Sequence, residues 1–124
     1  MNALLEREIR SYLETKKALV FNDKRGNRNA IKDTLVKMGV RPQNIFLEKH
    51  FKNAKQVLLN EHPEIIVSEF QVFDDYGLEL SRLQMEILND ITKKIFIIVT
   101  NNATQAAVAD AAEEEVEAFL VSPI

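Results

Sequence analysis

Short apolar runs alternate along this chain with longer segments of helical periodicity. Each run has three to five apolar residues in succession, which is typical of strands covered on both faces. In the longer segments, apolar residues recur three and four positions apart, which is typical of helices that bury one face. The expected strands are residues 18–21, 45–47, 65–67, 95–99 and 118–121.

Helices are expected before the first strand and between the later ones. The first covers residues 3–15, and its apolar face consists of Leu4, Leu5, Ile9, Tyr12 and Leu13. The apolar positions of the following helices are Ile31, Leu35 and Met38, then Phe51, Ala54 and Leu58, then Leu80, Leu83, Ile87 and Ile91. The alanine-rich segment 103–112 is helical by propensity. This alternation predicts an α/β fold, a single doubly wound sheet of five parallel strands with helices on both faces.

The composition limits the class of protein. A chain of 124 residues is expected to form one domain with its own core. No apolar run reaches about 18 residues, which excludes a membrane span. The charged N-terminus lacks the apolar stretch of a signal peptide, which indicates the cytoplasm. The absence of cysteine excludes disulfides, thiolate metal sites and cysteine nucleophiles.

Polar residues follow the carboxyl ends of the expected strands, where ligands collect in parallel α/β sheets. They are Asn22 and Asp23 after the first strand, Ser68, Glu69 and Gln71 at the third, Thr100 at the fourth and Ser122 after the fifth. Because loops also begin at strand ends, polar residues gather there without sharing a function. Taken alone, these residues favour that second interpretation.

Other kinds of site have less support. His50 and His62 have no second ligand at helical or hairpin spacing, which argues against a metal role. With three glycines, the chain has no glycine-rich phosphate loop. The segment from Arg25 to Arg28 opens a helix and could hold an anion, but a solvated turn is the favoured interpretation.

Three short motifs resemble the receiver domain of bacterial two-component response regulators. Gly77-Leu78-Glu79-Leu80 matches the loop and helix after the family's third strand, and Val99-Thr100 matches its fourth strand and hydroxyl residue. Val121-Ser122-Pro123 matches the end of its fifth strand, where the family has Lys-Pro. The resemblance covers residues 17–124 and implies the flavodoxin-like strand order 2-1-3-4-5. A receiver has a further helix after the last strand, and none is expected here.

The resemblance implies a role for each of these polar positions. In the family, an acid pair and an acceptor aspartate hold Mg²⁺, the aspartate takes the phosphoryl group, and a hydroxyl and a lysine then bind that group. By position, Asn22 and Asp23 fall at the acid pair, Glu69 at the phospho-acceptor, Thr100 at the switch hydroxyl, Ser122 at the lysine and Phe119 at the aromatic switch. Asn22, Glu69 and Ser122 depart from the family's pattern.

These departures weaken phosphotransfer. Glutamate moves the carboxylate oxygens by about 1.5 Å, a displacement that can cost on the order of 100-fold in rate, and Ser122 offers no charge to a phosphoryl group. We therefore expect a degenerate receiver (a pseudo-receiver) without enzymatic activity. It would need no cofactor and would act in a phosphorelay as a protein-interaction or dimerisation module for a signalling partner or effector domain. Glu69 would then either imitate a phosphorylated acceptor or mark the decay of an unused site.

Two alternative functions stay open. In the first, the receiver keeps weak Mg²⁺ binding through Asp23, Glu69 and the backbone carbonyl of Gln71, and senses phosphoryl groups or other anions with Thr100. In the second, the chain is a small enzyme or nucleotide binder on a flavodoxin-like fold. The second has less support, because no nucleophile–base pair is visible.

The first helix lies outside the resemblance, so we divide the chain into residues 1–16 and a receiver-like domain of residues 17–124. A parallel sheet left bare on one face exposes apolar surface that a soluble monomer rarely tolerates. We expect the helix to cover the sheet where a receiver's last helix would lie, within one subunit or by exchange between two in a homodimer.

Charge is distributed unevenly along the sequence. Residues 1–55 carry 13 basic and 6 acidic side chains, whereas residues 56–124 carry 3 and 13. In the receiver strand order the basic helices lie toward one edge of the sheet. The acidic run Glu113, Glu114, Glu115 and Glu117 lies toward the other edge. This predicts a basic partner or a head-to-tail self-contact, whereas the net charge of −3 argues against direct nucleic-acid binding.

Overall fold

Five parallel strands form the central sheet of the fold, in the order β2-β1-β3-β4-β5. They are β1 (Ala18–Phe21), β2 (Ile45–Glu48), β3 (Ile65–Glu69), β4 (Ile95–Thr100) and β5 (Ala118–Val121). The computed structural model describes residues 2–69, 76–89, 94–100 and 118–121, with the backbone alone for residues 69, 76–78, 100 and 118–121. The parallel α/β fold and the strand order expected from the sequence are confirmed.

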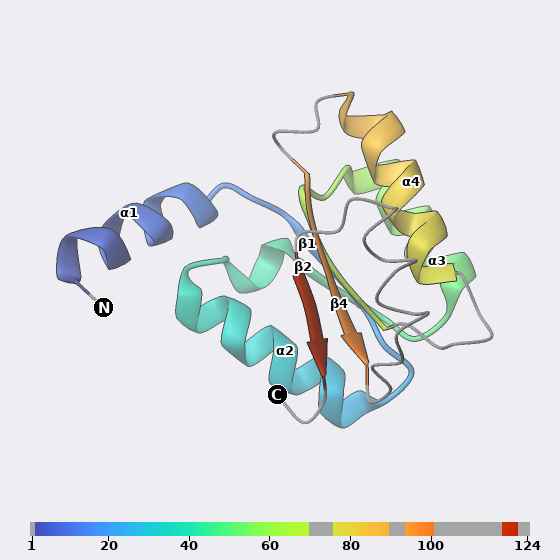
Figure 1. Ribbon diagram of the computed structural model, residues 1–124, viewed down its shortest axis with the longest axis horizontal. Coiled ribbons are helices and arrows are strands. Elements are labelled where there is room, and N and C mark those ends of the chain that lie inside the picture. Colours follow the sequence, from blue (N-terminus) through green and yellow to red (C-terminus); the bar gives the residue numbers. More distant parts are fainter. Residues whose placement is uncertain (1, 70–75, 90–93, 101–117, 122–124) are drawn as a thin grey trace.

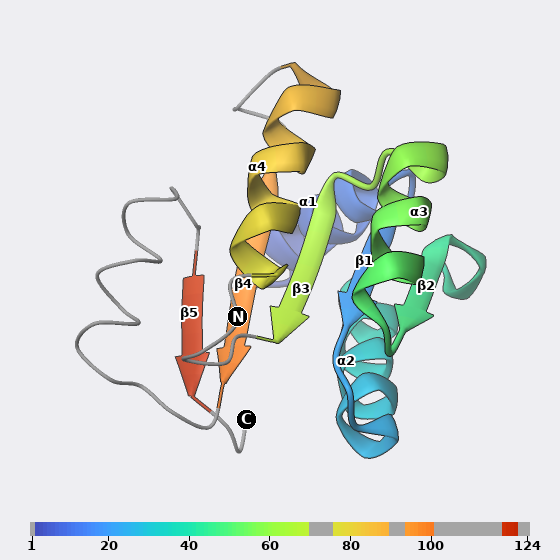
Figure 2. The ribbon, with the colours of Figure 1, turned by 90° about the vertical axis from the view of Figure 1, so that its right-hand side faces the viewer.

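Helices cover both faces of this sheet (Figure 1). They are α1 (Ala3–Leu13), α2 (Arg25–Met38), α3 (Phe51–Glu61) and α4 (Tyr76–Leu88), with a short 3₁₀ helix, η1 (Pro42–Asn44). Figure 2 shows α3 and α4 in front of the sheet and α1 and α2 behind it. In the part of the chain that the structure describes, no helix has the length and apolar character needed to cross a membrane. The helix expected over residues 103–112 lies outside this part.

Each face of the sheet has its own apolar core. Alternate residues of a strand point to opposite faces, so Leu19 and Phe21 of β1 pack on the side of α3 and α4, together with Leu58 of α3. Ala18 and Val20 pack on the side of α2. All four side chains of β1 are buried, as its continuous apolar run predicted.

Residues with positive φ follow three of the described helices, α2, α3 and α4. Gly39, with φ of 126°, ends α2, and its N–H donates to the carbonyl oxygen of Leu35. His62, with φ of 51°, ends α3 in the left-handed conformation. Asn89 has the same φ and directly follows α4. Ile91, which was expected in that helix, lies outside the described residues.

The first helix is attached to the domain by its later turns. Leu13 is buried, and Ile9 packs half-buried against the core on the α2 side. A Cβ atom added at Gly39 would lie 2.8 Å from the Cα atom of Arg10, so the end of α2 touches the backbone of α1. The absence of a side chain at Gly39 therefore permits this docking.

The remaining large apolar residues of α1 stay exposed. Leu4, Leu5 and Tyr12 expose 60%, 48% and 49% of their surface, and Figure 1 shows the helix extending away from the sheet. Within one chain, these three side chains do not make the cover over the sheet that we expected. Their packing on a second subunit stays a prediction.

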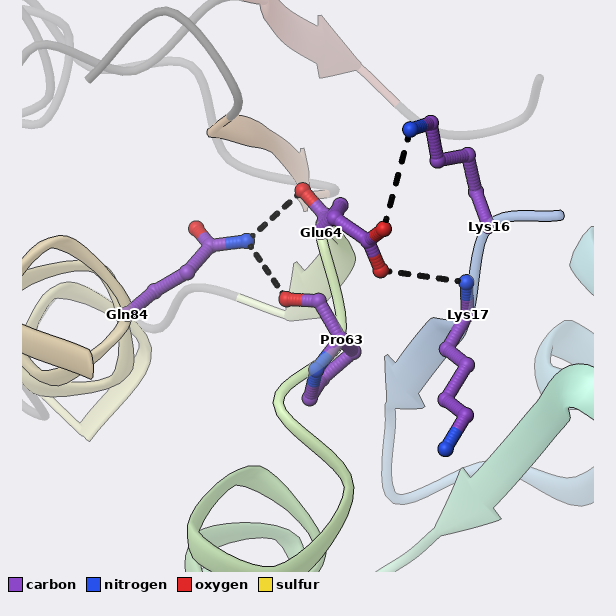
Figure 3. A network of polar contacts seen from close by, with 5 residues as sticks. All are labelled: Lys16, Lys17, Pro63, Glu64 and Gln84. Carbon is purple, nitrogen blue, oxygen red and sulfur yellow. Dashed lines mark hydrogen bonds and ion pairs between the residues drawn. The ribbon is translucent and has the colours of Figure 1, made fainter. Parts of the chain in front are cut away.

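A polar network joins α4 and the segment between α1 and β1 to the start of β3 (Figure 3). The Nε2 of Gln84 donates to the carbonyl oxygens of Pro63 and Glu64, at 3.2 and 2.9 Å. The carboxylate of Glu64 accepts from the backbone N–H of Lys17 at 3.3 Å, and its other oxygen lies 3.8 Å from Nζ of Lys16. These contacts fix the amino ends of β1 and β3 relative to each other.

Candidate functional site at the carboxyl ends of the strands

The carboxyl ends of β1, β3 and β4 lie side by side at one rim of the sheet, which we call the carboxyl rim. Phe21 pairs with Ser68, so the chain places Asn22 opposite Glu69, the last residue of β3. Neighbouring strands are about 4.8 Å apart, which brings the backbones of these two residues close together. The register therefore brings the expected acid-pair and acceptor positions to one level of the rim.

The other expected site residues follow from the same register. Thr100 ends β4 and pairs with Val121, one residue beyond the pair of Glu69 with Val99. Phe119 lies in β5, where it pairs with Ile98. For these positions the structure gives the backbone, so the roles inferred for their side chains stay predictions. Gln71, Ser122 and the acidic run 113–117 lie outside the described residues.

The side chain of Asn22 is built into the start of α2. The residue is 3% exposed, and its Oδ1 accepts from the backbone N–H of Lys24 at 2.9 Å and lies 3.5 Å from Nδ2 of Asn27. Lys24 is the N-cap residue and makes no side-chain cap bond of its own. Asn22 thus closes an Asx turn onto the N–H of the N-cap residue, directly before the helix.

Arg28 binds the end of β1 from α2. Its Nη1 donates to the backbone carbonyl oxygen of Asn22 at 2.8 Å, and the side chain is half-buried, whereas Arg25 is exposed. The solvated turn expected over Arg25 to Arg28 is therefore wrong for Arg28. The two arginines are neighbours on the helix surface, and Arg28 is the one whose guanidinium reaches the strand end. The sequence does not indicate which arginine contacts the end of β1, because this depends on how α2 packs against β1.

Two further polar residues lie at the carboxyl rim. Asp23, the acid-pair position that stays acidic, is exposed, and Ser68 is fully buried one residue before Glu69. Each has an interaction partner in the structure. Asp23 is therefore the accessible carboxylate of the acid pair, next to the buried amide of Asn22.

The side chains of the acid pair do not fit a Mg²⁺ site. Mg²⁺ requires near-octahedral oxygen ligands and usually takes one or two carboxylates. Here one acid position is a neutral amide whose oxygen is bonded to α2, and a guanidinium lies on the adjacent carbonyl. Within the described residues, no group of three or more His, Cys, Asp or Glu is placed to hold a metal. The weak site expected from Asp23, Glu69 and Gln71 stays a prediction that these contacts weigh against.

Several solved structures with the same fold are receiver domains. The chain is similar to the beryllium fluoride-activated receiver domain of DrrB, with a TM-score of 0.70, 16% identity and coverage of 88% of this chain and 86% of that one. It is similar to a mutant of the receiver domain of the histidine kinase CKI1 from Arabidopsis thaliana, with a TM-score of 0.71, 16% identity and coverage of 93% and 86%. It is also similar to the Vibrio cholerae chemotaxis protein CheY4, with a TM-score of 0.69, 15% identity and coverage of 88% of both chains.

These similarities confirm the receiver fold inferred from the sequence motifs. No family model matches the sequence, and no curated protein matches it. The fold is therefore shared with receivers at identities of 15–16%.

Proposed function

We propose that this receiver-fold chain is a degenerate receiver, which acts in two-component signalling as a protein-interaction or dimerisation module and not as an enzyme. It would work without ordinary aspartyl phosphorylation. The observation that carries the interaction role is the exposed apolar face of α1, which includes Leu4, Leu5 and Tyr12. The receiver fold supplies the signalling context, because the neighbours in structure are signalling domains.

The carboxyl rim supports the absence of phosphorylation. The acid pair has lost one negative charge at Asn22, and the amide that replaces it is bonded to Lys24 and Asn27. Glu69 has the wrong side-chain length for the acceptor, and Ser122 stands in place of a lysine. The loss of one acid weakens the metal site, the longer side chain displaces the nucleophile, and the missing lysine leaves the phosphoryl charge without compensation.

The exposed face of α1 fits a second copy of this chain as its first partner. A two-fold contact uses the same surface patch on both subunits, so one apolar helix face suffices for both sides. The helix also carries both signs of charge, with Glu6 and Glu8 beside Arg7 and Arg10. Two antiparallel copies of α1 can therefore place acids of one opposite bases of the other.

Light scattering on size-exclusion fractions over a range of concentrations tests this role. We expect the chain to form a dimer that dissociates on dilution, and we expect Leu5→Glu to shift it to a monomer. Leu59→Glu is the matched control, because Leu59 on α3 is exposed to a similar extent, 44% against 48%. A chain that is monomeric at all concentrations would contradict the homodimer and leave a different protein as the partner of α1. In that case, binding to a defined signalling partner has to be lost in Leu5→Glu. Binding that does not depend on Leu5 would contradict the proposal.

The phosphorylation half of the proposal has its own test. Intact-mass measurement after incubation with Mg²⁺ and acetyl phosphate should show no added phosphoryl group. A receiver domain that is known to accept acetyl phosphate serves as the positive control. A stoichiometric phosphoryl adduct on this chain would contradict the proposed function directly.

A further inference from the structure

The carboxyl rim contains a fixed positive charge. Nη1 of Arg28 lies 2.8 Å from the carbonyl oxygen of Asn22, and the arginine is half-buried at the end of β1. We propose that Arg28 is the resident cation of this rim and that Arg28 and Asn22 together exclude Mg²⁺ from it. This inference rests on the proposed function, since it explains how a degenerate receiver keeps its fold without the metal.

The start of α2 is unusually rich in positive charge. Lys24 is the N-cap residue, and Arg25 and Arg28 lie in the first turns, with no acidic residue in the first turn. Cations at a helix N-terminus oppose the helix dipole, so the stability of the helix does not account for them. The neighbouring strand ends offer another reason for these cations, because Asp23 follows β1 and Glu69 ends β3.

An arginine side chain can supply positive charge at a fixed position of the carboxyl rim without a bound metal ion. A guanidinium is always charged, is weakly hydrated, and has a planar set of donors that can bind a carbonyl oxygen and further acceptors together. Its contact with Asn22 is held by the fold of α2, so it needs no ion from solution. A divalent cation near Asp23 would have to approach this charge, and the repulsion lowers its affinity.

Asn22 also disfavours Mg²⁺ binding at the end of β1, through its hydrogen bonds. Its Oδ1 accepts from Lys24 and faces Nδ2 of Asn27, which occupies the lone pairs that a metal or a metal-bound water would need. Because the side chain is neutral, it offers no charge that would compensate for breaking these bonds. A divalent cation would therefore have to break the cap of α2 to gain one neutral ligand.

Magnesium titrations of the full chain followed by backbone NMR, at constant ionic strength, test the inference. We expect no saturable shift at Asn22 or Asp23 in the unmodified chain. The double variant Asn22→Asp with Arg28→Gln restores an acid and removes the cation, while aspartate keeps the acceptor for Lys24. It should bind Mg²⁺ saturably, with a dissociation constant of roughly millimolar order, and its unfolding midpoint should rise with Mg²⁺.

Arg25→Gln is the matched control, because it removes the same charge from the exposed side of the same turn. It should leave the chain without a saturable response. Mg²⁺ binding by the unmodified chain, a folded double variant that does not respond, or an equal gain in Arg25→Gln would each overturn the inference. Mg²⁺ binding without phosphorylation contradicts this inference alone, whereas phosphorylation of the unmodified chain contradicts the proposed function.

Discussion

The side-chain amide of Gln84 donates to the backbone carbonyl oxygen of Glu64 at 2.9 Å, and this bond fixes α4 to the start of β3. The same Nε2 lies 3.2 Å from the carbonyl oxygen of Pro63 and 3.4 Å from that of Ile95, at the start of β4. Gln84 is fully buried. One glutamine therefore supplies donors to carbonyl groups at the amino ends of two neighbouring strands, where the chain enters the sheet.

Replacing Gln84 by leucine should destabilise the fold. The substitution leaves the carbonyl oxygen of Pro63 without its donor and that of Glu64 with the N–H of Ile95 alone, and an unpaired buried acceptor costs about 1–3 kcal/mol. The free energy of unfolding, measured in urea, checks this value. Gln56→Leu on α3 is the control, since the Gln56 amide bonds to Asn60 on an exposed surface, at 3.2 Å. Equal effects of the two substitutions would show that the network at Glu64 adds nothing to stability.

The two glycines of α2 should respond to alanine in opposite directions. Gly39→Ala places a Cβ 2.8 Å from Arg10 Cα at φ of 126°, and the backbone strain alone costs about 1–3 kcal/mol. Gly26 has no heavy atom within 4 Å of an added Cβ, so Gly26→Ala should stabilise α2 by up to about 1 kcal/mol. Denaturation measures both changes. Hydrogen exchange should show faster opening of α1 in Gly39→Ala, and unchanged exchange there would mean that α1 does not depend on this contact.

Alanine substitutions in α1 should differ in their effect on stability, depending on whether the side chain is buried or exposed. Leu13→Ala removes a buried side chain and should cost about 2–5 kcal/mol. Leu5→Ala changes a side chain that is 48% exposed and should stay within about 0.5 kcal/mol. Urea unfolding at low protein concentration separates these effects from association. A large cost of Leu5→Ala under these conditions would indicate that Leu5 packs within its own chain.

Restoring the acceptor alone should not restore phosphorylation. In Glu69→Asp the carboxylate is again of receiver length, but Ser122 still stands at the lysine position, and by our inference Asn22 and Arg28 still disfavour Mg²⁺. We expect little or no adduct with acetyl phosphate and Mg²⁺ by intact mass. Addition of Asn22→Asp, Arg28→Gln and Ser122→Lys should raise the adduct at least about 100-fold, since these groups hold and neutralise the phosphoryl charge. Full phosphorylation of Glu69→Asp alone would show that these groups are not required.

Much of the fold follows from local patterns in the sequence. The run Ala18–Phe21 is apolar at every position, and a strand with both faces covered is the arrangement that buries all four residues. Gly39 marks a helix end because it can adopt positive φ without strain. Such features depend on a few neighbouring residues, so periodicity and turn formers suffice to predict them.

The contacts of α1 and of the carboxyl rim depend on how separate elements meet. The sequence shows an apolar face on α1, but whether Leu5 or Leu13 becomes buried depends on where the helix docks. Arg25 and Arg28 are equivalent as residue types and are neighbours on the helix surface, so which of them reaches the end of β1 depends on how α2 packs against that strand. Tertiary geometry of this kind has no local signature in the sequence.

The docking of α1 has a mechanical consequence. The helix has 11 residues and, at 1.5 Å per residue, is about 16 Å long. Leu13 and the contact between Arg10 and Gly39, at the end of α2, hold its carboxyl end. A partner bound to the exposed Leu4 at the other end is therefore connected to the domain through these contacts. The held end leads through residues 14–17 into β1, the strand whose far end leads to Asn22.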